Sequence, residues 1–158
     1  ESAMKTKLLG ALAAVAMLGA CESANQTADT SGAGAATGPR PGSQEDLAAN
    51  IGDRIFFDFD RYNIRADASA TLDRQAGWLG QFPQNNVQIE GHTDERGTRE
   101  YNLALGQRRA NAAREYLVAR GVAGSRISTI SYGKDRPAAL GSDEAAWAQN
   151  RRAVTVVR

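Results

Sequence analysis

Large apolar residues are distributed unevenly along this chain, and their distribution decides where a core can form. Between Cys21 and Asn50 the only large apolar residue is Leu47, whereas residues 51–158 carry Ile, Leu, Val, Phe, Tyr and Trp throughout. A segment of Ala, Gly, Ser, Thr, Asn and Pro buries too little apolar surface to order itself. We therefore expect one folded domain over residues 51–158, preceded by a flexible tether over residues 21–49.

The N-terminal stretch has the pattern of a secretory signal peptide. Residues 4–20 begin with Met-Lys-Thr-Lys and continue as a run of Leu, Ala, Val, Gly and Met. A membrane-spanning helix needs about 20 apolar residues, and this run is too short for one. We expect residues 4–20 to be removed as a signal peptide. Residues 1–3 precede Met4 and are expected to be a cloning remnant.

The residues at the end of this segment, Leu-Gly-Ala-Cys at positions 18–21, resemble the lipobox of bacterial lipoproteins. The resemblance implies cleavage before Cys21 and attachment of lipid chains to that residue. Each buried methylene adds about 0.8 kcal/mol of membrane affinity, so several chains would anchor the protein firmly. Glu22 after the cysteine implies the outer membrane. The alternative is an ordinary signal peptide with a chance cysteine.

The overall composition excludes several classes of function. The 158 residues are 42% hydrophobic and 23% charged, which suits one domain of average size and not a multidomain enzyme. Lys and Arg number 19 and Asp and Glu number 18, so the chain lacks the strong positive charge that nucleic-acid binding requires. One Cys and one His cannot supply an ordinary zinc site or an intramolecular disulfide. We expect no nucleic acid, metal or cofactor.

Strand and helix patterns alternate within the folded domain. The predicted elements are a strand over 54–59, a helix over 67–82, a strand over 87–91, a long helix capped by Thr98 and ending before Gly121, a strand over 126–132, a short helix over 143–149 and a last strand over 153–157. This order predicts an α/β (α+β) sandwich. Its βαβαβ core would have helices on one face of a small mixed sheet, followed by a short C-terminal helix and a closing strand.

Two oppositely charged residues are expected to meet at one end of this sheet. Asp94 lies in the loop 91–97, between a strand and a helix, and Arg109 lies on the helix that follows. Helical spacing places Asn102, Leu105 and Arg109 on nearly the same face. The carboxylate and the guanidinium would then line one cleft and could bind a small zwitterion. The alternative is a structural salt bridge in which Asp94 and Arg109 satisfy each other.

Five sequence motifs together resemble the OmpA-type peptidoglycan-binding domain. They are FDFDRYNI at 57–64, EGHTDERGTREYN at 90–102, LGQRRA at 105–110, SYGK at 131–134 and NRRAV at 150–154. They occur in order and cover essentially all of residues 51–158. The resemblance implies non-catalytic binding of peptidoglycan.

The ligand implied by this resemblance is the meso-diaminopimelate of the peptidoglycan stem peptide. On the family's pattern Asp94 holds its ammonium group and Arg109 its carboxylate. Further contacts are implied for Asn102, Leu105, Phe59 and Asp60. The resemblance also implies a lipid-anchored outer-membrane protein with its domain in the periplasm, a TolB-like periplasmic partner, and a role in envelope integrity and cell division.

Other residues receive structural interpretations. His92 could suggest a general base, but no Ser or Cys nucleophile accompanies it, so we expect it to pack or hydrogen-bond at its loop. Arg151 and Arg152 could form a basic patch, and the plainer interpretation is an ion pair near the last strand. The remaining aromatic residues considered as packing residues are Phe56, Phe57, Phe59, Trp78 and Trp147.

Two other functions remain open at this point. A peptidoglycan hydrolase would release soluble muropeptides from cell-wall sacculi, whereas a binding module would leave them intact. A lipoprotein that only scaffolds proteins would bind a TolB-like partner without needing the charges of Asp94 or Arg109. Under the binding hypothesis, Asp94→Ala or Arg109→Ala abolishes sacculus binding with little change in melting temperature.

Overall fold

A four-stranded mixed sheet lies at the centre of residues 38–158, the part of the chain that the computed structural model describes. The strands are β1 (Arg54–Phe56), β2 (Val87–His92), β3 (Ile127–Gly133) and β4 (Arg152–Val157), in the spatial order β1-β4-β2-β3. β2 and β3 are parallel, and β4 is antiparallel to both of its neighbours. The last strand of the sequence therefore closes the sheet by inserting between the first two.

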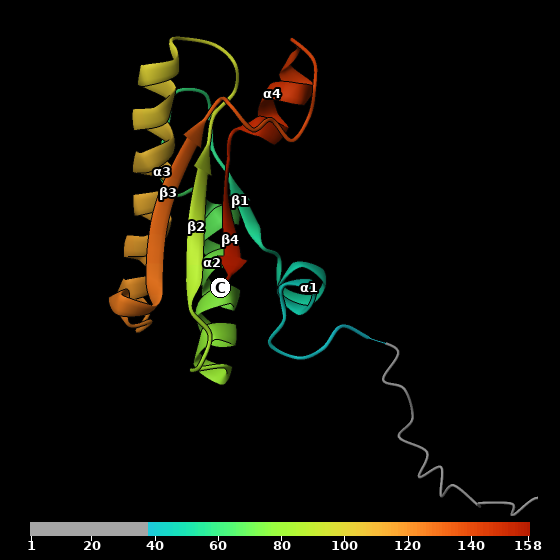
Figure 1. The fold of residues 1–158 in the computed structure, drawn as a ribbon, viewed down its shortest axis with the longest axis vertical. Coiled ribbons are helices and arrows are strands. Elements are labelled where there is room, and N and C mark those ends of the chain that lie inside the picture. Colours follow the sequence, from blue (N-terminus) through green and yellow to red (C-terminus); the bar gives the residue numbers. More distant parts are fainter. Residues whose placement is uncertain (1–37) are drawn as a thin grey trace, which may run out of the picture. The chain divides into compact units, whose positions relative to one another are not determined.

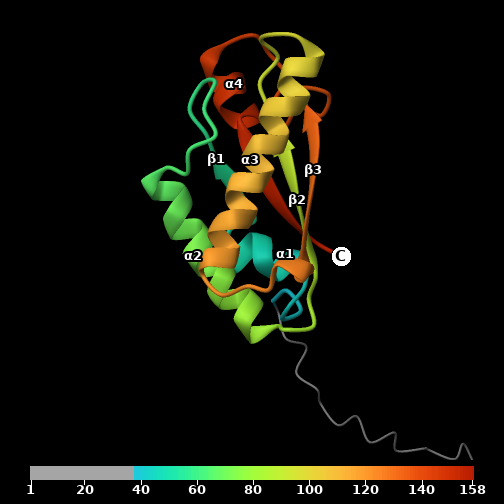
Figure 2. The same ribbon diagram turned by 90° about the vertical axis from the view of Figure 1, so that its left-hand side faces the viewer.

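Two long helices cover one face of this sheet. Figure 2 shows α3 (Arg99–Ala119) in front of the strands and α2 (Ala66–Gln81) to its left. A 3-10 turn, η2 (Gly124–Arg126), leads into β3, and α4 (Glu144–Asn150) precedes β4. The predicted α/β (α+β) sandwich is confirmed, with its βαβαβ core, its short C-terminal helix and its closing strand.

Alternation along the strands builds the core. In β2, Val87 and Ile89 are buried, whereas Gln88 and Glu90 between them are half-buried. The helices supply the opposing side chains of the same cluster: Leu72, Leu79, Ala110, Ala113 and Leu117. The core thus joins both long helices to the central strand that leads into the loop containing Asp94.

A close backbone contact fixes α3 against β2. A Cβ atom added to Gly91 would lie 1.8 Å from the carbonyl oxygen of Gly106, so only glycine allows this approach. Gly91 lies near the end of β2, three residues before Asp94, and Gly106 lies one helical turn before Arg109. The contact therefore sets the separation between the two charged residues.

The prediction of a flexible tether as far as residue 49 was wrong for its last part. Residues from Ser43 onward form α1 (Gln44–Asp46) and a π-helical turn, η1 (Leu47–Ile51), and Leu47 is fully buried in the core. The Asp46 carboxylate accepts hydrogen bonds from the Trp78 indole at 2.9 Å and the Gly42 backbone N–H at 2.8 Å. The polar composition of this segment gave no indication that the segment is ordered, because the residues that it contacts are distant in the sequence.

The first predicted strand also ends earlier than expected. β1 stops at Phe56 rather than at residue 59, although the Phe57 N–H still donates to the Arg151 carbonyl oxygen at 2.9 Å. Asp60 then adopts a positive φ of 55°, which turns the chain away from the sheet. This turn leaves Phe59 exposed. The other predicted elements begin and end within a residue or two of the observed ones.

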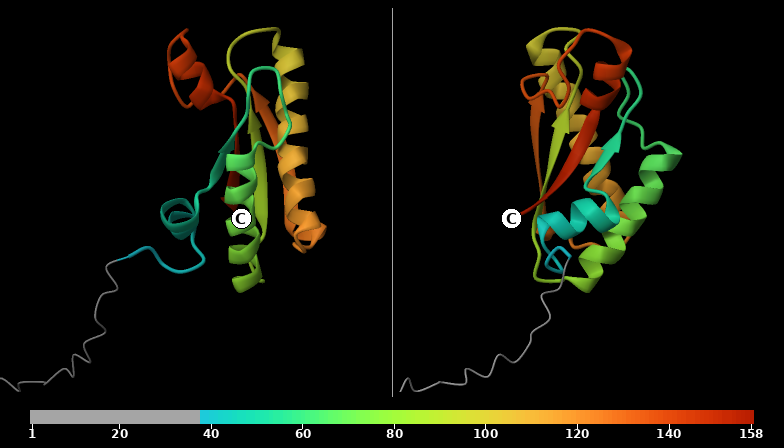
Figure 3. Two further views of the ribbon diagram at one scale, coloured as in Figure 1. Left: turned by 180° about the vertical axis from the view of Figure 1, so that it is seen from behind. Right: turned by 90° about the vertical axis from the view of Figure 1, so that its right-hand side faces the viewer.

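The domain has two distinct ends. Figures 1 and 3 show α1 and the C-terminus toward one end of the strands, and α4 with the loop after β2 at the other. The Gln44 side chain links the first end to β4 by donating to the Thr155 carbonyl oxygen and accepting from the Val157 N–H. The opposite end carries the candidate site.

Candidate functional site

A pocket of about 180 Å³ lies where the loop after β2, the start of α3 and the loop after β1 meet. Its lining residues are Phe59, Asp60, Thr93, Asp94, Arg96, Gly97, Tyr101, Asn102, Leu105 and Arg109. All six residues predicted for the ligand site are among them. Cys21, the predicted lipidation site, lies outside the described residues.

Arg109 forms the buried end of the pocket. Its side chain is 0% exposed and donates to three backbone carbonyl oxygens, those of Arg61 at 2.8 Å, His92 at 2.9 Å and Asp58 at 3.2 Å. Burial, opposed by the charge of Asp94 and reinforced by that of Arg151, lowers the pKa of Arg109 to about 10. The guanidinium therefore remains charged at neutral pH and holds the loop after β1 against β2.

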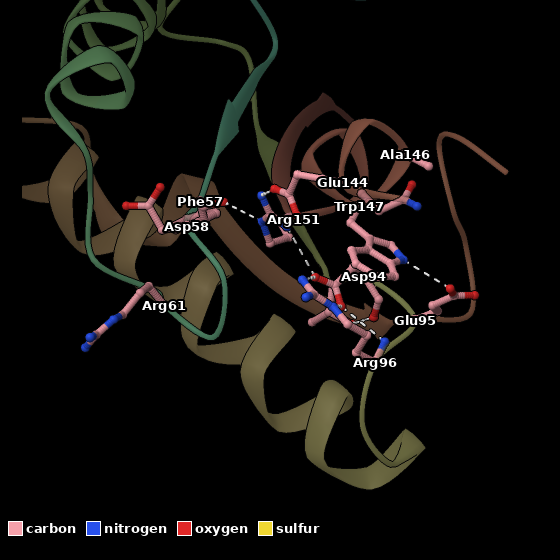
Figure 4. A network of polar contacts seen from close by, with 12 residues as sticks. Phe57, Asp58, Arg61, Asp94, Glu95, Arg96, Glu144, Ala146, Trp147 and Arg151 are labelled. Carbon is pink, nitrogen blue, oxygen red and sulfur yellow. Dashed lines mark hydrogen bonds and ion pairs between the residues drawn. The ribbon is translucent and has the colours of Figure 1, made fainter. Parts of the chain in front are cut away.

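Asp94 forms the other charged end. Its Oδ2 atom lies 2.7 Å from Nη2 of Arg96 and 3.5 Å from Nη1 of Arg151, and Figure 4 shows the carboxylate between these two side chains. Burial raises the pKa of Asp94, but hydrogen bonds from the side chain and backbone of Arg96 outweigh it and leave the pKa below its ordinary value. Asp94 is thus a buried, ionised carboxylate.

Arg96 covers this carboxylate from the solvent side. The guanidinium carbon lies 3.9 Å from the ring centre of Phe59 and 4.0 Å from that of Trp147, within the range of cation–π contacts. The Trp147 indole donates to Glu95 Oε1 at 3.0 Å, as Figure 4 shows. Arg96 therefore joins the loop after β2 to both the loop after β1 and α4.

The start of α3 holds the remaining wall of the pocket. The Asn102 amide donates to the carbonyl oxygens of Arg96 at 2.9 Å and Thr98 at 3.0 Å, which fixes the loop that carries Asp94. The Tyr101 hydroxyl donates to Asp60, the residue with positive φ. The predicted N-cap, Thr98, accepts from the Tyr101 N–H at 3.2 Å.

Asp94 and Arg109 are not paired with each other. Both residues are described in full, and no hydrogen bond or ion pair joins them, because each has other partners. The alternative of a mutual salt bridge is therefore wrong. Two opposite charges stand at the ends of one pocket without neutralising each other directly.

Comparison with known proteins decides the family. The sequence pattern of the OmpA family matches residues 56–151. The chain belongs to the OmpA family. Within this family, it stands with proteins named "Peptidoglycan-associated lipoprotein". The one from Rhizobium meliloti (strain 1021) is 66% identical over 126 residues, which cover 80% of this chain and 70% of the relative.

Two further relatives support the grouping of this OmpA-family chain with these proteins. The protein of the same name from Mesorhizobium japonicum is 58% identical over 151 residues, covering 94% of this chain and 88% of the relative. The crystal structure of the peptidoglycan-associated lipoprotein from Burkholderia pseudomallei is 45% identical, with a TM-score of 0.67, and covers 72% of this chain and 100% of that one. Fold and sequence thus point to the same group.

Sequence reasoning did not assign Arg151, which contacts Asp94 beside Arg96, to this OmpA-family site. Its side chain is buried and donates to the Phe57 carbonyl oxygen at 3.0 Å and to Glu144 at 2.6 Å, besides its contact with Asp94. The plainer interpretation, an ion pair near the last strand, fits Arg151. Its neighbour Arg152 instead donates to backbone carbonyl oxygens of Asn150 and Arg136. The motif at 150–154 was the available signal, but it does not say which arginine points toward Asp94.

His92 packs inside the OmpA-family fold rather than lining the pocket. The side chain is 2% exposed, neither ring nitrogen has a hydrogen-bond partner, and its ring stacks obliquely on Tyr132 at 5.6 Å. Burial, reinforced by the charges of Arg152 and Arg136, lowers the pKa of His92 to about 4. The imidazole is therefore neutral at physiological pH.

Two negative findings apply to residues 38–158 of the chain. Within them, no group of three or more His, Cys, Asp or Glu side chains is arranged to hold a metal ion. No helix in this same part has the length and apolar character needed to cross a membrane.

Proposed function

We propose that this protein binds peptidoglycan non-covalently through the diaminopimelate of the stem peptide and so links the outer membrane to the cell wall. The observation that carries the proposal is a pocket lined by an ionised carboxylate and by a guanidinium that is not paired with it. The names of the relatives, which are peptidoglycan-associated lipoproteins, support the same ligand.

The side-chain end of diaminopimelate carries both an ammonium and a carboxylate, which suits the two ends of the pocket. Asp94 would take the ammonium and Arg109 the carboxylate. Three of the five N–H groups of a guanidinium are used by backbone carbonyl oxygens at Arg109, which leaves two for a ligand. Asn102 and Leu105 would form one wall, and the backbone of Phe59 and Asp60 the other.

Such a site is expected to bind each ligand weakly. A hydrogen bond to a charged group contributes about 1.5–3 kcal/mol, and a few of them, after the cost of association, give affinities of roughly micromolar to millimolar. The cell wall presents many identical stem peptides, and many copies of the protein on one membrane would hold it by avidity. Weak individual contacts would allow the protein to move over the wall.

The cellular setting in this proposal rests on the family resemblance. Lipidation at Cys21 would anchor the chain to the outer membrane and leave the domain in the periplasm. A TolB-like periplasmic protein would be its partner in a Tol-Pal system that supports envelope integrity and cell division. No observation favours a hydrolase, because His92 is buried and does not line the pocket.

Sedimentation with purified sacculi tests the proposal. Asp94→Asn keeps the shape of the side chain and removes its charge, so we expect the variant to remain in the supernatant while the wild type sediments. The matched control is Asp58→Asn, which removes a carboxylate that is 68% exposed and paired with Arg65 outside the pocket. Sedimentation of Asp94→Asn at the wild-type level would refute the site.

The same assay tests the ligand. Sacculi whose stem peptides contain lysine in place of diaminopimelate lack the second carboxylate, so wild-type binding to them is expected to be weaker. Equal binding to both kinds of sacculi would remove Arg109 from its proposed role. Release of soluble muropeptides during the incubation would favour a hydrolase instead.

A further inference from the structure

The acceptor positions of Asp94 are already filled. A carboxylate offers about four lone-pair positions. Oδ1 accepts from the backbone N–H of Arg96 at 3.1 Å and from its Nε at 3.2 Å. Oδ2 accepts from Nη2 of Arg96 at 2.7 Å and from Nη1 of Arg151 at 3.5 Å. A ligand ammonium can reach this carboxylate only after one of these donors leaves.

The four donors differ in how easily they can leave. The backbone N–H is fixed by the turn of the loop, and the Arg151 side chain is 8% exposed and held by the Phe57 carbonyl oxygen and by Glu144. The Arg96 side chain is 31% exposed, and its other contacts are two aromatic rings at the rim of the pocket. Water can solvate its guanidinium once it moves outward, so Arg96 is the releasable donor.

We infer that Arg96 is the internal occupant of the ammonium position, and that ligand binding exchanges its guanidinium for the ligand's ammonium. This inference rests on the proposed function. The exchange keeps Asp94 paired with a cation before and after binding, which avoids leaving a buried carboxylate without a partner. Arg96 thereby sets the affinity of the site without being a ligand contact.

The same movement affects the loop after β1, which Arg109 also contacts. Arg109 is 0% exposed while Arg96 stacks on Phe59, and Phe59 belongs to the loop whose carbonyl oxygens Arg109 holds. Release of Arg96 removes the contact between Phe59 and the loop after β2. The exchange at Asp94 therefore loosens a loop that Arg109 also holds.

Arg96→Gln tests the exchange by removing the competing cation and keeping the backbone N–H. Isothermal titration with a soluble N-acetylmuramyl tripeptide that contains diaminopimelate is expected to show binding roughly tenfold tighter than wild type. Arg99→Gln is the matched control, because it makes the same charge change three residues away, at an arginine paired with Asp135. It is expected to bind like the wild type. Unchanged or weaker binding by Arg96→Gln would overturn the inference.

A second measurement follows Arg96 itself. In the free wild-type protein its Nε–H NMR signal is expected to be protected from exchange with water, and saturation with the tripeptide should remove this protection. Protection that persists in the bound protein would overturn the exchange even if Arg96→Gln bound more tightly. If the wild type binds the tripeptide and Arg96→Gln binds with the same affinity, the exchange alone is refuted. If the wild type does not bind the tripeptide, the proposed function is refuted as well.

Discussion

The two charged ends of the pocket are built in opposite ways. Arg109 is completely buried, bonds only to backbone carbonyl oxygens and holds two segments of the fold together. Asp94 is paired with charged side chains, one of which, Arg96, lies at the rim and is partly exposed. In the sequence the two residues form a symmetrical pair of opposite charges. The structure makes Arg109 part of the framework and leaves Asp94 paired with a partly exposed cation.

The largest effect on stability and binding should come from a substitution that displaces Asp94 and Arg109 together, at the contact between β2 and α3. In Gly91→Ala the new methyl group would lie 1.8 Å from the Gly106 carbonyl oxygen, so β2 and α3 must separate. We expect a loss of about 3 kcal/mol or more in the free energy of unfolding, together with loss of sacculus binding. Urea denaturation and sedimentation measure the two effects.

Gly77→Ala is the control for this substitution. Gly77 lies on the exposed face of α2 with no heavy atom within 4 Å of an added Cβ. Alanine there should leave binding intact and stabilise the helix by up to about 1 kcal/mol. A wild-type free energy of unfolding in Gly91→Ala would show that the close contact does not set the separation of the two ends.

A smaller effect on stability should distinguish Arg109, which holds two segments of the fold together, from Asp94, which is paired with charged side chains. Arg109→Ala leaves three carbonyl oxygens without their donor and opens a space in the interior, so we expect a loss of about 3 kcal/mol. Asp94→Asn keeps the side-chain volume and should lose only about 1 kcal/mol. For Arg109→Ala, this prediction differs from the expectation of little change in melting temperature that the sequence alone suggested.

Thermal unfolding of both variants checks this difference. Arg109→Lys is the matched variant, since it keeps the charge but cannot reach all three carbonyl oxygens. It should fall between the wild type and Arg109→Ala in melting temperature. If Asp94→Asn were destabilised as much as Arg109→Ala, the distinction between the two ends would be lost.

The last effect is a pH dependence of stability near Arg109, where the carbonyl oxygen of His92 accepts a hydrogen bond from the Arg109 guanidinium. The pKa of His92 is about 4 in the folded protein and 6.5 without its surroundings, so the unfolded chain takes up the proton first as pH falls. This contribution to stability is therefore present above about pH 6.5, declines by about 2 kcal/mol by pH 5 and falls further toward pH 4. Urea denaturation across this range measures the decline.

His92→Phe supplies the comparison, because it keeps an aromatic ring and removes the titrating group. Its stability should vary less than that of the wild type between pH 6.5 and pH 4. An equal decline in both proteins would assign the acid sensitivity to groups other than His92.

The sequence was informative where spacing along one element decides the geometry. Asn102, Leu105 and Arg109 share a helix face, and all three line the pocket with Asp94. Spacing carries no such information across elements. Arg151 lies 57 residues from Asp94, and Leu47 belongs to a polar segment that docks only because Trp78 and β4 supply partners for its neighbours.

Side-chain direction was the second limit. Arg96 stands inside a recognised motif, but its stacking between Phe59 and Trp147 depends on the turn at Asp60 and on the position of α4. Neither follows from local propensity, because both are set by how distant loops meet. The sequence therefore predicted the fold class better than it predicted the contacts of individual charged side chains.

The placement of α1 and of the pocket toward opposite ends of the strands has a mechanical consequence. If the chain is pulled through residue 38 while a ligand is gripped at the pocket, the load runs along the strands, as their directions in Figures 1 and 3 indicate. The hydrogen bonds between β1 and β4 are then strained in shear and must break together rather than one after another. A domain loaded in shear in this way resists a pulling force far better than one whose strand hydrogen bonds break one at a time from an edge.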